Sequence, residues 1–252
     1  MLLAIDVGNT NTVCGVWDGQ SWLAIWRRET NDGATEDVVA DWLKGCFESI
    51  GLPWRVEKAI CGSVVAAEDE KWLRVVKNWL DAPISILKQG ADVGLTVNYD
   101  PPQAVGADRL ANALGALSRF NPPIIVIDFG TATTFDVVDT SGAFAGGAIL
   151  PGVKISAEAL FERAPRLPRV ALQAPESAIG RSTVRSLQSG IMLGYAGAID
   201  ALAARMLAEL GGSAHIIATG GLGSLFVGLC SSIESYDPTL TLDGLVVASR
   251  LI

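Results

Sequence analysis

The chain has 252 residues, half of which are hydrophobic, and its 27 acidic and 19 basic side chains give a net charge of −8. This length permits one large domain or two of ordinary size, with enough apolar residues for a substantial core. Nonspecific binding to nucleic acid rests on clustered lysine and arginine, so the acidic balance argues against a nucleic-acid partner.

Strands and helices are expected to alternate along the chain, which is the pattern of an α/β sheet covered by helices. In the first half, the sequence predicts a hairpin over 2–16, strands at 21–29, 57–65 and 84–87, and helices at 36–50 and 68–80. A predicted helix at 103–119 bridges to the second half. There we expect a hairpin over 124–138, strands at 143–149 and 214–219, and helices at 152–163, 182–210, 222–231 and 241–251. The two halves are predicted to be residues 1–118 and 119–252, with the boundary near 103–123.

Several common sites and signals are missing from the sequence. The uncharged stretch 216–233 contains four glycines and three serines, so it is interpreted as a strand, a turn and a helix rather than a membrane span. No signal peptide is visible, and the four cysteines form no C-x-x-C pair, which favours reduced thiols in a cytoplasmic protein. The one histidine, His215, lies in a predicted strand and is interpreted as structural. Neither G-x-S-x-G nor a P-loop motif is present.

Two segments of the chain repeat each other. Residues 2–16 read LLAIDVGNTNTVCGV, and residues 124–138 read IIVIDFGTATTFDVV. Asp6 aligns with Asp128, and Thr12 with Thr134, at one constant offset. Each segment is an apolar strand, a D-x-G turn, small hydroxyl residues and a second β-rich run. The repeat predicts a duplicated domain.

The two D-x-G turns are expected to face one cleft, because ligands of α/β sheets bind where strand ends and turns converge. Glycine allows close backbone approach, and threonine and asparagine can donate to phosphate oxygens. Neither turn contains lysine, so cations and backbone N–H groups would have to neutralise a bound triphosphate. The alternative is that both turns are only hairpin connections.

These motifs resemble the acetate-kinase, sugar-kinase, Hsp70 and actin superfamily, and within it the type III pantothenate kinases. The resemblance covers essentially the whole chain. It rests on DVGNTNT at 6–12, Tyr99-Asp100-Pro101-Pro102, Gly106-Ala107-Asp108-Arg109, the FGTATT turn at 129–134, GGAILPG at 146–152, and Thr219-Gly220-Gly221. D-x-G turns alone are weakly specific, whereas the combination of these motifs is strongly specific. The resemblance implies two ribonuclease-H-like, actin-like halves, each a mixed sheet flanked by helices, with a cleft between them.

The resemblance also implies an activity: ATP-dependent phosphorylation of the primary hydroxyl of pantothenate, the first step toward coenzyme A. It places Asp108 as the base facing that hydroxyl, a role that suits a carboxylate. Arg109 can bind the carboxylate of pantothenate. The remaining substrate contacts implied are Tyr99, Gly106 and Ala107. A plain ion pair on the first helical turn is the alternative for Asp108 and Arg109.

ATP and its cations are assigned by the same resemblance. The phosphates are expected along residues Asp6, Val7, Gly8, Asn9, Thr10, Asn11, Thr12 and Val13. Thr131, Gly220 and Gly221 are expected to contact ATP, the two glycines by lying flat against adenosine at the start of a helix. Asp6 is expected near Mg²⁺, and Asp128 is expected to hold a monovalent cation, K⁺ or NH₄⁺.

The family is dimeric, so a homodimer with a shared substrate site is expected. Thr183 matches a position that reaches pantothenate in the partner's site. Gly190, Gly194 and Gly197 lie on the same predicted helix, where each costs about 1 kcal/mol relative to alanine. Close approach of a second helix would offset that cost, and packing within one chain is the alternative.

Two other functions are alternatives to the pantothenate kinase. The first is a sugar kinase of the same superfamily, but the repressor-related type carries a cysteine-rich zinc motif that the four scattered cysteines here cannot form. A non-catalytic transcriptional regulator is disfavoured by the acidic balance and the intact Asp108.

Overall fold

The computed structural model describes all residues from Met1 to Ile252. The chain forms two compact units. The first contains Met1–Ser118 and Leu240–Ile252, and the second contains Arg119–Thr239. Each unit has its own five-stranded mixed sheet, which confirms the predicted fold class of two similar halves.

The first unit consists of one sheet and four α-helices. The strands are β1 (Leu2–Val7), β2 (Asn11–Trp17), β3 (Trp22–Glu29), β4 (Lys58–Ser63) and β5 (Ile84–Leu87), in the order β3-β2-β1-β4-β5. The helices are α1 (Glu36–Ser49), α2 (Ala66–Val75), α3 (Ala107–Leu117) and α6 (Leu240–Ala248). A π-helical turn continues α2 over Val76–Leu80, and short 3₁₀ turns lie at Gly90–Val93 and Pro102–Ala104.

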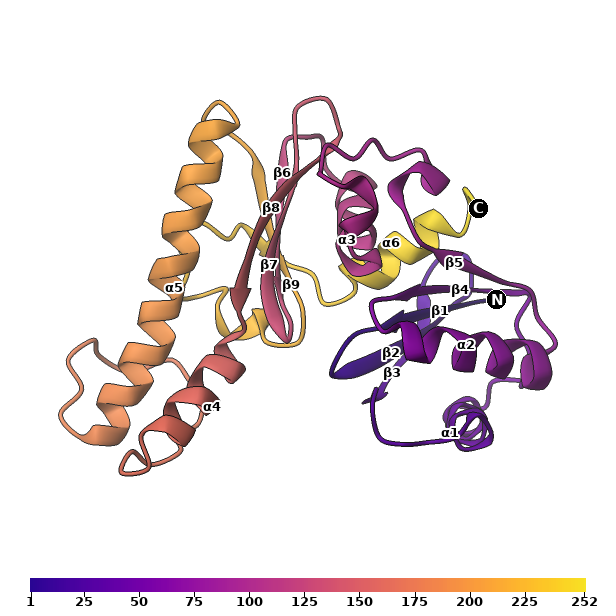
Figure 1. The fold of residues 1–252 in the computed structure, drawn as a ribbon, viewed down its shortest axis with the longest axis horizontal. Coiled ribbons are helices and arrows are strands. Elements are labelled where there is room, and N and C mark those ends of the chain that lie inside the picture. The colour runs from indigo at the N-terminus through magenta and orange to yellow at the C-terminus, as the bar shows by residue number, and fades with distance from the viewer. The chain divides into compact units, whose positions relative to one another are not determined.

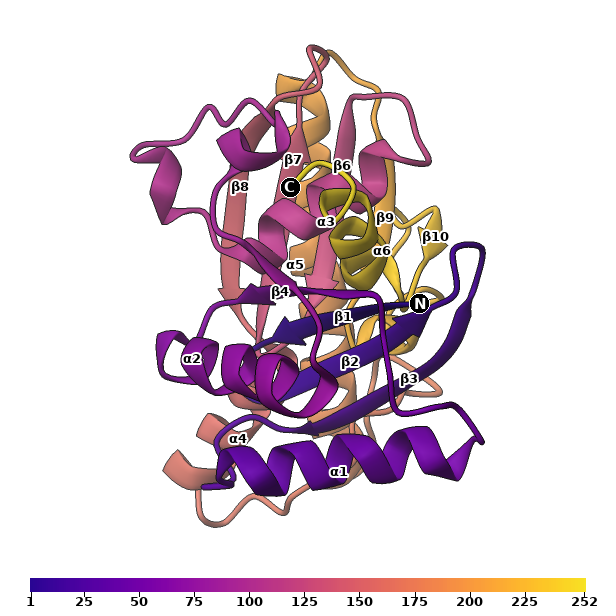
Figure 2. The ribbon, with the colours of Figure 1, turned by 90° about the vertical axis from the view of Figure 1, so that its right-hand side faces the viewer.

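Helices cover both faces of this sheet. Leu3, Ile5 and Val7 of β1 share a core with α1 and α2, which lie along the same side of β1–β3 in Figure 2. α3 and α6 pack against each other and against β4, with Ala107 and Leu245 close to Gly62. Alternate residues of β1 are therefore buried on opposite faces, which explains its nearly unbroken apolar sequence.

The second unit repeats the same sheet order. The strands are β6 (Ile124–Phe129), β7 (Ala132–Val138), β8 (Phe144–Pro151), β9 (His215–Thr219) and β10 (Ser235–Tyr236), in the order β10-β9-β6-β7-β8. The helices are α4 (Val153–Arg163) and α5 (Thr183–Glu209), and a 3₁₀ turn lies at Gly223–Leu225. α5 runs along this sheet in Figure 1, and its Met192, Ala196, Ile199 and Ala203 are buried in the core.

The internal repeat is confirmed, with one change of register. Val7 pairs with Thr12 across the first turn, whereas Phe129 pairs with Thr133 across the second. The second turn is thus one residue shorter. Thr133, not Thr134, is the structural counterpart of Thr12, and both are almost completely buried.

Three predicted elements differ from the structure. Residues 240–252 belong to the first unit, because α6 packs on α3, so the second unit ends at Thr239 and not at 252. No α-helix forms over 222–231; only the 3₁₀ turn at Gly223–Leu225 does. The predicted helix at 103–119 begins at Ala107, because the extended backbone of Val105 and Gly106 separates it from the preceding turn.

The crossing of α3 and α6 depends on glycine. A Cβ on Gly244 would overlap the carbonyl of Ala111, and one on Gly115 would overlap the carbonyl of Leu240. The two backbones are therefore in direct contact, and α6 fixes the position of α3.

We expect Gly244→Ala to lower the free energy of unfolding by about 1–3 kcal/mol, the usual cost of overpacking. Gly45→Ala is the matched control, since Gly45 lies on the exposed side of α1 with nothing near its Cβ position. That change should leave stability unchanged or raise it by up to about 1 kcal/mol. Urea unfolding measures both. Equal stability of the two variants would contradict the glycine crossing.

The four cysteines are all free, and burial raises the pKa of each thiol, that of Cys230 to about 12.

By length and composition alone, helix α5 could cross a membrane. A core helix passes the same test, and the buried face of α5 contributes to the core of the second unit.

Candidate functional site

The first D-x-G turn connects β1 to β2. Asp6 is half-buried near the end of β1, opposite Val13 of β2 and Gly62 of β4. The Val7 side chain lies in the core, so only its main chain could reach a ligand.

Gly8 closes this turn. Its N–H donates to the carbonyl of Asn11 at 3.1 Å, and a Cβ on Gly8 would come within 3.0 Å of the same oxygen. The side chains of Asn9 and Thr10 are exposed at the tip. These two side chains are therefore presented to solvent.

Thr12 lies differently from the other turn residues. Its side chain is 1% exposed, and its hydroxyl lies 3.0 Å from the hydroxyl of Thr30, itself buried. Thr12 thus faces the interior of the unit, where it supports the turn. Thr30 was not identified from the sequence; the only signal was a small polar cluster, TND at 30–32, directly after the predicted strand 21–29.

Asp108 and Gly106 form a compact structure at the start of α3. Gly106 is the N-cap, and a Cβ there would come within 2.5 Å of the Asp108 carboxylate. The Asp108 Oδ1 accepts a hydrogen bond from the N–H of Arg109 at 2.8 Å. The glycine is therefore required by the carboxylate that folds back over it.

The electrostatics of Asp108 are set by two opposing effects. Burial raises the pKa of the carboxyl group, and the N–H and charge of Arg109 lower it in part, so that the pKa is raised overall. Arg109 is 7% exposed, and its guanidinium lies 5.9 Å from the ring centroid of Tyr99. The predicted substrate residues Tyr99, Gly106, Asp108 and Arg109 are thus brought together within the first unit, with Ala107 buried beneath them against Gly62.

The second D-x-G turn connects β6 to β7. Asp128 lies opposite Thr134 of β7 and Thr219 of β9, and Gly130 N–H donates to Ala132 carbonyl at 3.1 Å. Thr131 is exposed at the tip of the turn.

Two glycines allow other segments to approach this turn. Gly220 has φ +85°, and a Cβ on it would overlap the Asp128 carboxylate. A Cβ on Gly152, the N-cap of α4, would overlap the carbonyl of Thr131. Gly152 is the last residue of the GGAILPG motif, from which no such contact is predicted. Gly220 follows β9 as predicted, yet neither it nor the exposed Gly221 opens an α-helix.

Thr183 is the first residue of α5 and is exposed. Next to it is a hollow of about 530 Å³ lined by Arg181, Arg185 and residues 177–179. Arg181 and Arg185 bring positive charge to this hollow, which Glu176 offsets in part because its carboxylate lies 3.6 Å from the Arg185 guanidinium.

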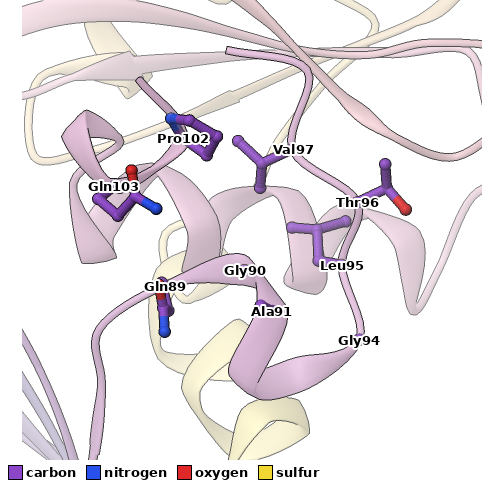
Figure 3. Close-up of a pocket in the computed structure, with 9 residues that line it drawn as sticks. All are labelled: Gln89, Gly90, Ala91, Gly94, Leu95, Thr96, Val97, Pro102 and Gln103. Carbon is purple, nitrogen blue, oxygen red and sulfur yellow. The ribbon is translucent and has the colours of Figure 1, made fainter. Parts of the chain in front are cut away.

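A second hollow lies in the first unit (Figure 3), with a volume of about 460 Å³. No charged side chain lines it; Gln89, Gln103, Leu95 and Val97 are among its walls. It contains none of the predicted site residues and does not suit a triphosphate.

The carboxylates of both turns are oxygen donors that could hold metal ions. No group of three or more His, Cys, Asp or Glu side chains could hold an ion without help. Mg²⁺ commonly binds to one or two carboxylates together with substrate phosphates, and Asp6 and Asp128 are oxygen donors of that kind. The space over Gly220, which a Cβ would fill, leaves room for the Asp128 carboxylate. The residues present therefore fit cations that share ligands with a nucleotide.

Comparison with known proteins agrees with this arrangement. The pattern of the type III pantothenate kinase family matches residues 2–205. A type III pantothenate kinase of Desulfosudis oleivorans is 44% identical over 248 residues, covering 97% of each chain. One of Myxococcus xanthus is 43% identical over 246 residues, covering 97% of this chain and 96% of the relative.

A solved structure supports the fold independently. MreB 5 of Spiroplasma citri, bound to AMPPNP, has a TM-score of 0.54 with 14% identity, covering 99% of this chain and 95% of that one. At this identity the likeness shows the actin-like fold alone. The sequence similarity goes further, because the family pattern covers most of the chain and the related proteins match nearly all of it, and so the chain belongs to the type III pantothenate kinase family.

Proposed function

We propose that this protein transfers the γ-phosphoryl group of ATP to the primary hydroxyl of pantothenate, forming 4′-phosphopantothenate, and that it does so in the cytoplasm. The observation that carries the proposal is the family match, which extends over the segments containing Asp108 and both D-x-G turns. The geometry of Asp108 at the start of α3 supports it.

In this proposal Asp108 is the catalytic base. Its Oδ1 is fixed by the Arg109 N–H, so the carboxylate can orient the substrate hydroxyl and accept its proton late in a loose transition state. The raised pKa brings the carboxylate closer to neutral pH, where a base is most effective. Arg109 carries a positive charge against Tyr99 and would bind the pantothenate carboxylate.

ATP is assigned to residues of both units. In the first unit the backbone of residues 6–13 and the exposed Asn9 and Thr10 would bind the phosphates, with Asp6 as the Mg²⁺ ligand. In the second, Thr131, Gly220 and Gly221 would contact ATP, and Asp128 would hold K⁺ or NH₄⁺. The bound cations would supply the positive charge that no lysine provides.

An assay of ADP release tests the proposed function. The purified chain is incubated with Mg²⁺-ATP, K⁺ and either pantothenate or a panel of small sugars. The expected result is ADP release with pantothenate and none with any of the sugars. Turnover with a sugar and none with pantothenate would move the chain to another kinase class.

A homodimer with a shared site is also proposed. The Cβ positions of Gly190, Gly194 and Gly197 on α5 meet nothing within 4 Å, so packing inside the chain does not explain these glycines. A second copy packed against them would offset their helix cost and would present Thr183, with Arg181 and Arg185, to the partner's pantothenate.

The dimer prediction is checked by sedimentation combined with activity. Wild type should sediment as a dimer, and Gly194→Leu should give a monomer with little activity. The control must lie outside the proposed interface. Gly45→Ala is suitable, because Gly45 is exposed on α1 in the first unit and nothing lies near its Cβ position. A wild-type monomer that is fully active at nanomolar concentration would rule the shared site out.

A further inference from the structure

The turn that bears Asn9 and Thr10 is held from behind by the segment that follows β3. The Thr30 hydroxyl donates to the carbonyl of Gly8 at 2.7 Å, and the Thr30 N–H donates to the carbonyl of Thr10 at 3.0 Å. The Asn31 amide donates to the carbonyl of Asn9 at 3.4 Å. Three successive carbonyls of the turn are thus bound by two neighbouring residues.

The hydrogen bond between the two buried hydroxyls has one direction. Thr30 has a single hydroxyl proton, and the Gly8 carbonyl takes it. The proton between the two threonines must then come from Thr12, 3.0 Å away. Thr12 is therefore a donor to Thr30, and its hydroxyl proton is directed inward.

Holding the carbonyls fixes the direction of the N–H groups. A trans peptide unit is planar, and its C=O and N–H point in opposite directions. Because the Gly8 carbonyl points to Thr30, the Asn9 N–H points away from it, and the Asn11 N–H likewise points away from the Thr30 N–H. Backbone N–H groups turned the same way form a concavity that binds anions.

The segment that provides Thr30 is itself anchored. The Asp32 carboxylate accepts hydrogen bonds from Arg28 at 2.5 Å and from the Ala34 N–H at 3.0 Å. The Arg28 guanidinium also stacks on Trp42 of α1, 5.0 Å from the ring centroid. Thr30 is 3% exposed, so no ligand reaches it.

We infer that Thr30 is a positioning residue for ATP: it sets the orientation of the phosphate-binding turn through the Gly8 carbonyl and touches no substrate itself. The inference rests on the proposed function, because it takes residues 6–13 to bind the phosphates of ATP. Thr30 is buried and lies outside every motif described above, and the inference gives it a specific effect on nucleotide affinity.

The test compares three variants with the wild type. Thr30→Val keeps the shape and removes the hydroxyl, which leaves the Gly8 carbonyl and Thr12 without a partner. We expect it to raise the Kd and KM for Mg²⁺-ATP about tenfold, the scale for one buried hydrogen bond, with the KM for pantothenate within about twofold of wild type. Thr30→Ser keeps the hydroxyl and should restore ATP affinity. Thr35→Val is the matched control and should match wild type in ATP affinity, because Thr35 lies in the same connection and its hydroxyl donates to Asp37 and not to the turn.

The outcomes separate this inference from the proposed function. If the wild type binds no Mg²⁺-ATP in calorimetry, the proposed function fails. If the wild type binds it and Thr30→Val binds equally well, or if the KM values for both substrates rise alike, the positioning role fails. If Thr30→Val does not fold, Thr30→Ala, which adds no methyl group against the Gly8 carbonyl, is compared with Thr30→Ser by the same criteria.

Discussion

Asp108→Asn is expected to reduce kcat by about 10²–10⁴-fold, the usual contribution of a positioned base, while ATP and pantothenate still bind. Asparagine keeps the size of aspartate, and its Oδ1 can still accept the Arg109 N–H. It cannot take the substrate proton. The measurements are kcat and KM for both substrates, with calorimetry for the two dissociation constants.

The stability of the same variant separates loss of the base from loss of the fold. The folded-state pKa of Asp108 is raised by burial, so its ionised form is disfavoured by folding and reduces stability above the unfolded-state pKa. At pH 7 the neutral asparagine should therefore leave the melting temperature unchanged or raise it. Asp41→Asn, exposed on α1, is the control that should alter neither activity nor stability.

The raised pKa also predicts a pH profile. A base must be deprotonated, so kcat/KM should fall as the pH decreases through the pKa of Asp108. This fall should occur at a higher pH than for an ordinary carboxyl, whose pKa is near 3.9.

If Asp108→Asn keeps more than about a tenth of the wild-type kcat, Asp108 is not the base.

Much of the fold could be predicted because its signals are local. The two hairpins and their D-x-G turns are periodic and repeat along the chain, so β1 and β6 were located correctly. The return of α6 to the first unit could not be predicted, since the apolar sequence of 240–248 suits either unit. Helix α6 packs on α3 because their backbones fit closely at Gly115 and Gly244. That fit is a property of the folded backbone.

The site shows the same division. Gly106, Asp108 and Arg109 are consecutive or nearly so, so their meeting at one helix start is visible in the sequence. Thr30 is 18 residues from its hydroxyl partner Thr12 and reaches it only through the β2–β3 register. The inward direction of Thr12 is likewise set by strand pairing, which the run of small polar residues at 9–12 does not reveal. The cleft that the two halves were expected to share remains a prediction.

The second large effect is expected for the monovalent cation. Wild-type activity should require K⁺ or NH₄⁺, because the two D-x-G turns of the proposed ATP site contain aspartates and no lysine to offset the charge of the phosphates. Asp128→Asn should abolish that dependence and lower kcat by about 10²-fold, the scale for losing one fixed electrostatic group. Activity is measured in matched K⁺ and Na⁺ buffers, and Glu162→Gln, an exposed charge change on α4, is the control.

A second variant tests the same carboxylate without altering it. A Cβ on Gly220 would overlap the Asp128 side chain, and φ +85° at Gly220 already disfavours any other residue. Gly220→Ala should therefore displace the carboxylate and reproduce the weakened K⁺ response of Asp128→Asn. The two changes act on one group, so their combination should be little worse than either alone. Full wild-type activity in a buffer containing only Na⁺ would overturn the cation role, and a normal K⁺ response in both variants would move the cation away from Asp128.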